Sequence, residues 1–543
     1  MGKTISDHHL SAVRSSAKWW NISLWGVVVI YFFVILAISL SYHWGYLSTL
    51  TDVGTFDQAV WATLHGFPFL NTNVFSTPVN YFGIHFRPIL AIFLPFYALV
   101  PRIEWMIAAQ SFALAITAWP IYLLNLRVLR SEVVAFCIVI AYLINPFILS
   151  VPFWVFRPES LVVPFIVLAM LGVEKANFRL TLFSCLVVVL CKEHFGIMVV
   201  GVGILWWLRN HDLAMALVLV GFGLLYSLSV LMIFMPALSP IGKHVMLGSD
   251  MGQMSRYNWL GKGLGEIAQK ILFQPFVVGK KIIEMGGGVY LLLLMILFFG
   301  MPLAGAEFLL PGLADFAANL LSANPLPRSV ISYHSVSLIP VITVASIYGL
   351  NRIAQRMDRY SVKELAILSL VVGLSSGYLM CRHSLPWSYW EPAKLVNTRE
   401  SEVSLIQRLV GNEASVSAQA NVGSHFSQRL QIFQYPNKVG EVDAIILRLA
   451  SPTRKITYPT NYPTELKSIT GTLDAHLQMS RHEYIKSIEN LLEADEYGVL
   501  LWKDPWLVFS RTSGDNSNLD AIKKKLEELR AKWKMDPVPQ QNF

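Results

Sequence analysis

Long apolar runs without charged residues are the feature that most limits how this chain can fold. The first covers residues 22–42, and similar runs recur as far as residue 381. A helix needs about 20 such residues to cross a bilayer, and inside lipid only a helix or a closed barrel satisfies its own backbone hydrogen bonds. Of the 543 residues, 54% are hydrophobic and only 14% are charged. We therefore expect a polytopic α-helical membrane protein.

The pattern predicts eleven spans, several of them shorter than the ideal length. They lie at residues 22–42, 103–126, 131–152, 159–174, 178–191, 195–208, 213–235, 287–301, 303–322, 334–351 and 364–381. The apolar stretch His85–Val100 is left out of this count. It is short and contains Arg87 and several prolines, which favours a re-entrant or surface-lying helix.

Lysines and arginines on the short loops predict the orientation, because such loops stay in the cytoplasm. The basic residues fall before the first span and on alternate loops: Lys3, Arg14, Lys18, Arg127, Arg130, Lys175, Arg179, Arg209, Arg352, Arg356, Arg359 and Lys363. The amino terminus is therefore expected inside and the other loops outside. The long loop 236–286 is basic although it faces out, but loops of that length cross with little regard to charge.

After residue 381 the composition changes, and residues 382–543 predict a soluble α/β domain. Residues 401–410 and 481–494 have helical periodicity, whereas residues 414–418 and 442–447 read as buried strands. With eleven spans and the amino terminus inside, this domain is expected in the periplasm. Residues 1–381 form the predicted transmembrane domain.

The net charge of +8 does not indicate nucleic-acid binding, because most of the basic residues lie on predicted cytoplasmic loops. The four cysteines lie inside or at the ends of spans and lack the spacing of a zinc site or a disulfide framework: Cys137, Cys185, Cys191 and Cys381.

Carboxylates at the outer ends of spans are the main candidates for chemistry, because ionisable groups at membrane depth usually face a cavity or a partner. Asp52 follows the first span and could serve as a general base, although an aspartate there also suits a helix cap. Asp57, one turn further on, is more readily structural. Glu159 opens a span after Pro158, where an acid also suits the helix dipole.

Cations and further acids occur on the same outer loops. Arg87, beside His85, could bind a phosphate, and Lys192 with Glu193 and His194 forms three consecutive ionisable residues between apolar runs. The remaining polar candidates precede the tenth span: Arg328, Tyr333 and His334. Snorkelling or plain loop charges are the alternative reading. The histidines and carboxylates could hold a divalent metal, but their spacing matches no ligand motif, so no metal ligand is assigned and no cofactor is certain.

At these residues the chain resembles a bacterial membrane-protein family catalogued as domain of unknown function 2079. More distantly it resembles the GT-C superfamily of glycosyltransferases that use lipid-linked sugars. The segments that carry the resemblance are Asp52–Gln58, Leu64–Pro68, His85–Leu90, Arg157–Glu159, Lys192–Gly196 and Ala414–Gln419.

The GT-C resemblance implies a catalytic acid in the first outer loop, flanked by membrane-surface helices. The resemblance thus assigns Asp52 as the base, residues 43–102 as the juxtamembrane region and Glu159 as a second acid. Glu193 is a further candidate acid or orienter from the residue pattern alone. Gln58 and Arg157 lie in the matching segments, so we also expect them to contact substrate. The family pattern has His-Pro-Glu where this chain has Arg157, a change that removes a possible metal ligand.

The leading hypothesis is a membrane glycosyltransferase at the outer face of the bacterial inner membrane. Its donor would be a polyprenyl-phosphate sugar, and its acceptor an envelope glycan, lipid or protein. A transporter or lipid flippase is the alternative, although no internal repeat supports it. A non-catalytic assembly or scaffold protein is the third reading.

Overall fold

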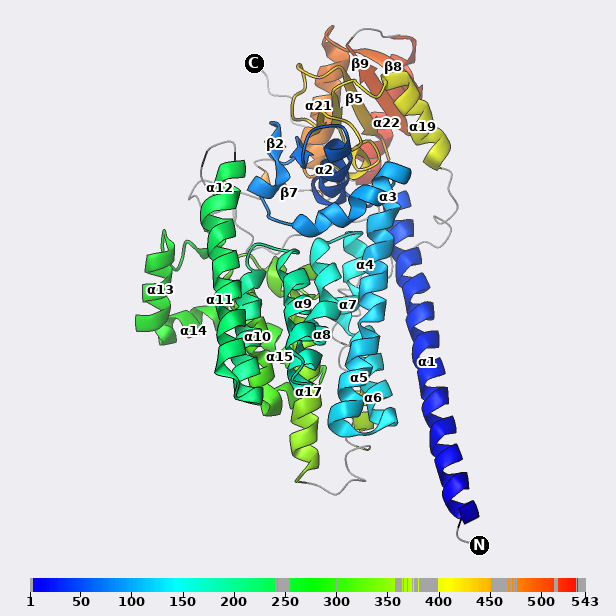
Figure 1. Cartoon of the computed structure of the whole chain (residues 1–543). Coiled ribbons are helices and arrows are strands. Elements are labelled where there is room, and N and C mark those ends of the chain that lie inside the picture. Colours follow the sequence, from blue (N-terminus) through cyan, green and yellow to red (C-terminus); the bar gives the residue numbers. More distant parts are fainter. Residues whose placement is uncertain are drawn as a thin grey trace. The chain divides into compact units, whose positions relative to one another are not determined.

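The computed structural model describes residues 3–239, 254–298, 300–356, 399–450, 476–511 and 516–533, with some residues between these ranges. The chain forms two compact units, and neither is continuous in sequence (Figure 1). Unit 1 consists of Met1–Ser39, Phe82–Ala91 and Glu104–Ser388. Unit 2 consists of Leu40–Tyr81, Ile92–Ile103 and Tyr389–Phe543.

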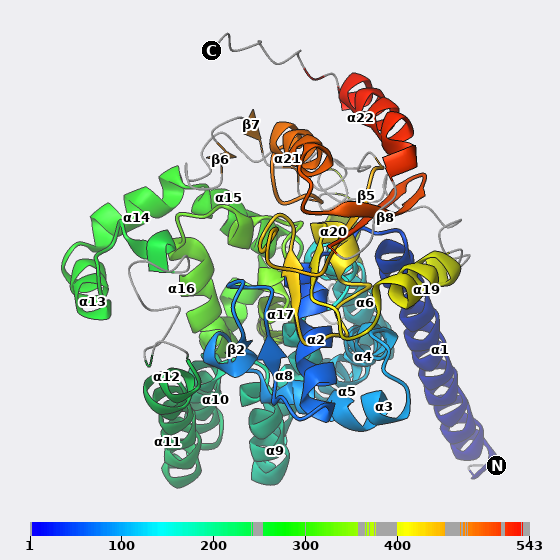
Figure 2. The same cartoon turned by 90° about the horizontal axis from the view of Figure 1, so that it is seen from above.

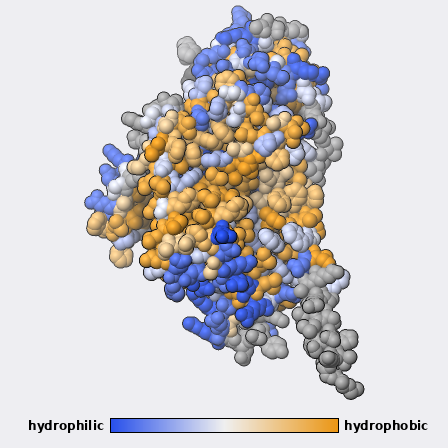
Figure 3. Space-filling model, viewed as in Figure 1, coloured by the Kyte–Doolittle hydropathy of each residue, from blue (hydrophilic) through white to orange (hydrophobic). Residues whose placement is uncertain are grey.

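Three helical stretches among the described residues are long and apolar enough to cross a membrane: Trp19–Trp44, Glu104–Leu129 and Leu213–Leu238. The first belongs to α1 (Lys3–Trp44), the second joins α4 (Glu104–Ile116) to α5 (Ala118–Leu129), and the third runs from α11 (Leu213–Ser229) to α12 (Met235–Leu238). Apolar residues dominate the visible surface of the helical part (Figure 3).

Two bent pairs, if each is one span, raise the number of candidate spans in the described part of the chain to five. In one, α6 (Glu132–Leu143) meets Pro146–Trp154 at 44°, and in the other, α15 (Gly287–Ile296) meets Met301–Leu321 at 108°. Four more predicted spans are short helices: α8 (Val163–Glu174), α9 (Phe178–Val189), α10 (Phe195–Asn210) and α17 (Leu338–Ala354). The predicted span 364–381 lies largely outside the described residues. The count of eleven therefore stays a prediction.

Glycine allows the helices of unit 1 to pack closely. A Cβ on Gly349 of α17 would lie within 1.9 Å of the Met301 carbonyl oxygen, and one on Gly223 of α11 within 2.3 Å of the Gly196 carbonyl oxygen. Small residues at such crossings are typical of helix packing in membranes. The stretch His85–Val100 forms two short helical segments, η3 (Pro88–Phe93) and α3 (Leu94–Leu99), which are too short to span.

Unit 2 contains the expected α/β layer. Its five-stranded sheet has the order β4-β3-β5-β9-β8. The strands are β3 (Val416–Ala418), β4 (Ile432–Gln434), β5 (Ala444–Arg448), β8 (Gly498–Lys503) and β9 (Trp506–Ser510). Strand β3 runs parallel to β4 and β5, whereas β9 runs antiparallel to β5 and β8. Parallel strands need cover on both faces, and this sheet has it.

Helices α21 (Arg481–Glu493) and α22 (Leu519–Trp533) lie on one side of the sheet, and α19 (Arg399–Val410) and α20 (Ala420–Gly423) on the other (Figure 2). A capping box begins α21, in which the Ser480 side chain accepts from the Glu483 amide and the Glu483 carboxylate accepts from the Ser480 amide. The apolar face of this helix then packs against the sheet.

The loop after the first apolar helix packs with the tail, which differs from the division at residue 381 expected from sequence. Leu50, at the start of η1 (Leu50–Gly54), is fully buried in a cluster with Val416 and Ile446. A Cβ on Gly54 would lie only 3.2 Å from the Ser424 Cα, so a larger residue there would need the Ser424 backbone to shift. Helix α2 (Thr55–Leu64) follows directly. The sequence does not predict this packing, because the two segments are more than 300 residues apart.

Candidate functional site

A loop before α8 positions Glu159. Pro158 begins the short helix η5 (Pro158–Val162), which continues into α8. The Gln110 side chain of α4 secures this loop: its amide oxygen accepts from the Arg157 amide at 2.8 Å and from the Ser160 hydroxyl at 3.1 Å, and its nitrogen donates to the Val155 carbonyl at 2.9 Å. The backbone around Glu159 is thus fixed from a second helix.

Two cations from distant segments meet one oxygen of Glu159. Arg87 Nη2 lies 2.6 Å and Lys192 Nζ 3.1 Å from Glu159 Oε1. Glu159 and Arg87 are each 3% exposed. The other oxygen, Glu159 Oε2, is buried and has no hydrogen-bond partner among the described residues. The structure therefore brings together three of the residues singled out from sequence.

A third cation lies on the same loop. The Arg157 guanidinium is 4.2 Å from the centre of the Tyr333 ring and 4.8 Å from that of Trp154. The Trp154 indole donates to the Ile331 carbonyl at 2.6 Å, and the Tyr333 ring stacks on His334 at 4.3 Å. Aromatic faces hold a cation without neutralising its charge.

Glu193 extends the cluster. Its Oε1 lies 3.2 Å from His85 Nδ1. Burial lowers the pKa of His85 despite the carboxylate. Burial opposes the charge of Glu193, but His85 and Lys192 lower its pKa well below the usual range. Burial likewise opposes the charge of Lys192, yet Glu159 raises the pKa of this ammonium above its usual value. Lys192 therefore remains a cation.

His194 is oriented by an acid that the sequence analysis missed. His194 Nε2 lies 2.8 Å from Asp315 Oδ1, and the Ser337 hydroxyl donates to Asp315 Oδ2 at 2.5 Å. Asp315 lies in α16 (Leu313–Leu321), inside an apolar run that was read only as a span. An acid inside an apolar run is unusual, and this feature alone could have identified Asp315 as a candidate.

Arg328 and His334 are engaged locally. The Arg328 guanidinium donates to the carbonyl of Asn319 at 2.9 Å and to that of Ser322. His334 Nδ1 lies 2.5 Å from the Ser332 hydroxyl. These bonds hold the turn before α17, so we propose a structural role for Arg328.

Asp52 lies in unit 2, within η1, and is half-buried. The Thr49 hydroxyl donates to Asp52 Oδ2 at 2.8 Å. The neighbouring Thr51 hydroxyl exchanges hydrogen bonds with the Gln478 side chain at 3.0 and 3.2 Å. The loop that carries Asp52 is thereby tied to the turn that precedes α21.

Asp57 and Gln58 have internal partners in unit 2. The Asp57 carboxylate accepts from the Tyr97 hydroxyl at 2.7 Å, the Ser427 hydroxyl at 2.5 Å and the Gln428 amide at 3.1 Å. Gln58 is fully buried, and its amide donates to the Thr72 hydroxyl at 2.8 Å. Both side chains secure α2 against the rest of unit 2, so we propose structural roles for them.

The candidate metal ligands are divided between separate pairs. His85 lies with Glu193, and His194 with Asp315. Within the part of the chain that the structure describes, no three His, Cys, Asp or Glu side chains come together in a way that could hold a metal ion.

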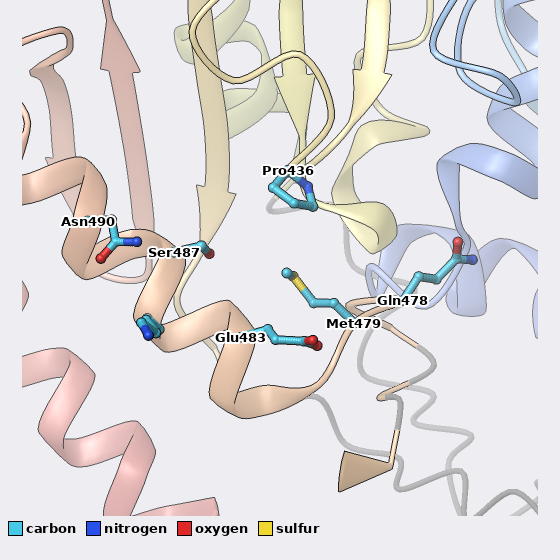
Figure 4. Close-up of a pocket in the computed structure, with 7 residues that line it drawn as sticks. Pro436, Gln478, Met479, Glu483, Ser487 and Asn490 are labelled. Carbon is cyan, nitrogen blue, oxygen red and sulfur yellow. The ribbon is translucent and has the colours of Figure 1, made fainter. Parts of the chain in front are cut away.

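An open hollow of about 470 Å³ lies in unit 2 beside α21 (Figure 4). Five of its seven lining residues have polar side chains: Pro436, Gln478, Met479, Glu483, Lys486, Ser487 and Asn490. Gln478 joins this hollow to Thr51 on the loop of Asp52.

Comparisons with known proteins give one family. The profile described as predicted membrane protein (DUF2079) matches residues 42–504. No curated protein matches the chain. A crystal structure of ArnT from Cupriavidus metallidurans bound to undecaprenyl phosphate aligns with it at 12% sequence identity, over 92% of this chain and 99% of the ArnT chain, with a TM-score of 0.47.

Proposed function

The chain belongs to the DUF2079 family of predicted membrane proteins, and we propose that it transfers a sugar from a polyprenyl-phosphate donor to an acceptor at the outer face of the inner membrane. The observation that carries this proposal is the cation cluster of unit 1. Arg87, Arg157 and Lys192 come from three segments; Arg87 and Lys192 share one oxygen of Glu159, and Arg157 lies against the Tyr333 ring.

The charge balance favours a phosphate ligand. Arg87 and Lys192 both contact the single carboxylate of Glu159, so two positive charges face one negative charge there. A polyprenyl-phosphate sugar is a phosphodiester with one negative charge, and its leaving group is a phosphomonoester with up to two. The cations therefore stabilise the departing group more than the bound donor, which is what catalysis requires.

The reaction assigns separate tasks to separate residues. Asp52 takes the proton of the acceptor hydroxyl, and the acceptor oxygen attacks the anomeric carbon of the sugar. The bond from that carbon to the phosphate oxygen breaks, and the phosphate leaves with the electron pair. Attack from the opposite side inverts the anomeric centre. Lys192 and Arg87 hold the leaving phosphate.

His194 is a second candidate for the base. Its Nε2 is held by Asp315, which leaves Nδ1 as the basic nitrogen. The two candidates lie in different units and are separable by mutation. An Asp52→Asn variant should lose transfer about 10²–10⁴-fold if Asp52 is the base, whereas a His194→Asn variant should then retain most of it.

The first test is mass spectrometry of lipids that copurify with the native protein and with Asp52→Asn. We expect the variant to accumulate a polyprenyl-phosphate sugar, because binding persists while transfer stops. The matched control is Asp504→Asn, since Asp504 is an exposed acid paired with Lys525 in unit 2. Ordinary phospholipids alone in all three samples would contradict the proposal.

A second test isolates phosphate recognition. Binding of a polyprenyl phosphate and of the matching polyprenol is measured with the native chain and with Lys192→Gln. The variant should weaken binding of the phosphate and leave that of the alcohol unchanged. Equal loss for both ligands would mean that Lys192 acts through folding instead.

A further inference from the structure

Helices α13 (Leu264–Phe273) and α14 (Pro275–Glu284) have an apolar edge that the protein does not cover. Figures 1 and 2 show both helices at the margin of the helical bundle of unit 1. Each has ten residues and is about 15 Å long, half of what a span requires. Neither crosses a membrane by itself.

The two helices share one pattern. In α14, Val278 is buried and Ile282 half-buried, whereas Phe276 is 90% and Ile283 70% exposed. Phe276 and Ile283 are seven positions apart and therefore lie on one side of the helix. In α13, Ile271 is half-buried, whereas Leu272 and Phe273 are 72% and 77% exposed. Protein thus covers one edge of each apolar face and leaves the other open.

Lysines accompany the open edge. Lys280 is exposed four positions from Phe276, about 40° round α14; Lys281 is exposed farther round the same helix, and Lys262 just before α13. Among the described residues, Lys281 pairs with Glu284, which is itself exposed, at 3.3 Å. An apolar edge beside exposed lysines is the pattern of a helix that lies in the interface of a bilayer with anionic headgroups.

We propose that α13 and α14 form a hairpin that lies in the headgroup layer of the membrane. The exposed apolar side chains enter the boundary of the acyl chains, and the lysines face lipid phosphates. The following helix supports this assignment: α15 begins at Gly287, only three positions after the end of α14, and is apolar enough to enter the hydrocarbon. The inference is independent of the glycosyltransferase proposal.

The test is site-specific labelling of the full chain in phosphatidylcholine nanodiscs that contain phosphatidylglycerol. Phe276→Cys and Ile283→Cys carry an environment-sensitive fluorophore on the open edge. Lys281→Cys is the matched control, because it lies five positions from Phe276 and about 140° round the same helix. The native chain, labelled in parallel, gives the background from its own cysteines.

We expect blue-shifted emission at positions 276 and 283 and its loss when nitroxide lipids are added, with water-like emission at position 281. Replacing Lys280 and Lys281 by glutamine should reduce the blue shift in phosphatidylglycerol more than in phosphatidylcholine alone. Water-like emission at all three positions would overturn the proposal. A blue shift that nitroxide lipids do not quench would also overturn it, since protein would then cover the edge.

Discussion

Two buried carboxylates, Glu159 in unit 1 and Asp57 in unit 2, are held in opposite ways. Glu159 meets the cations of Arg87 and Lys192 through one oxygen, and its other oxygen has no hydrogen-bond partner among the described residues. Asp57 accepts hydrogen bonds on both oxygens from neutral donors, namely two hydroxyls and an amide. Both are almost fully buried, so burial alone does not separate them.

The difference lies in what each arrangement can still bind. Neutral donors that occupy both oxygens of Asp57 fix the packing of α2 and keep its negative charge, which would repel an anionic ligand. Two cations that share the single carboxylate of Glu159 are placed where an anion can also meet them. Hence we place ligand binding at Glu159 and a structural role at Asp57. The following predictions test this distinction.

Glu159→Ala should have the largest effect on stability. Removing the carboxylate leaves the buried Arg87 guanidinium without it, and breaking a buried pair costs about 3–5 kcal/mol. We expect a lower midpoint of thermal unfolding in detergent. A polyprenyl phosphate should restore part of the loss, because its phosphate supplies the missing negative charge. Restoration by the polyprenol to the same extent would refute the phosphate assignment.

Asp57→Asn should cost less and respond to no ligand. The asparagine keeps one acceptor oxygen and replaces the other with an NH₂ group. At least one buried donor then loses its acceptor, which lowers the free energy of unfolding by about 1–3 kcal/mol. Thermal unfolding with and without polyprenyl phosphate measures this. A ligand-dependent recovery comparable to that of Glu159→Ala would remove the distinction between the two sites.

Arg157→Lys should have a smaller effect on folding and a clear one on binding. Lysine keeps the charge but loses the planar contact with Tyr333 and Trp154, which is worth about 0.5–2 kcal/mol. We expect weaker binding of polyprenyl phosphate with nearly unchanged thermal unfolding. Tyr333→Phe is the control, since the ring face persists. Equal binding by Arg157→Lys and the native chain would exclude Arg157 from the ligand site.

The sequence predicted the classes of structure better than the partnerships within them. Apolar runs indicated the helices, and short apolar segments indicated the sheet of the tail. The loops with Glu159 and Lys192 were found because charges at span ends are costly, but nothing in local spacing pairs residues 87, 159 and 192. Asp315 was missed because its apolar surroundings marked only a span, and the packing of Leu50 with Val416 depends on contacts across the chain.

The smallest effect is expected from the pair Lys438 and Glu441 in unit 2. Its nitrogen and oxygen are 2.7 Å apart, close to the 2.6 Å of Arg87 and Glu159, yet the Glu441 side chain is 67% exposed against 4% for Glu159. Water and salt screen an exposed pair, so Glu441→Gln should cost about 0–1 kcal/mol. Measured in the same detergent, a loss as large as that of Glu159→Ala would mean that distance and not burial sets the strength of these pairs. A negligible loss of stability in Glu441→Gln would mean that the large effect at Glu159 comes from the burial of its cations.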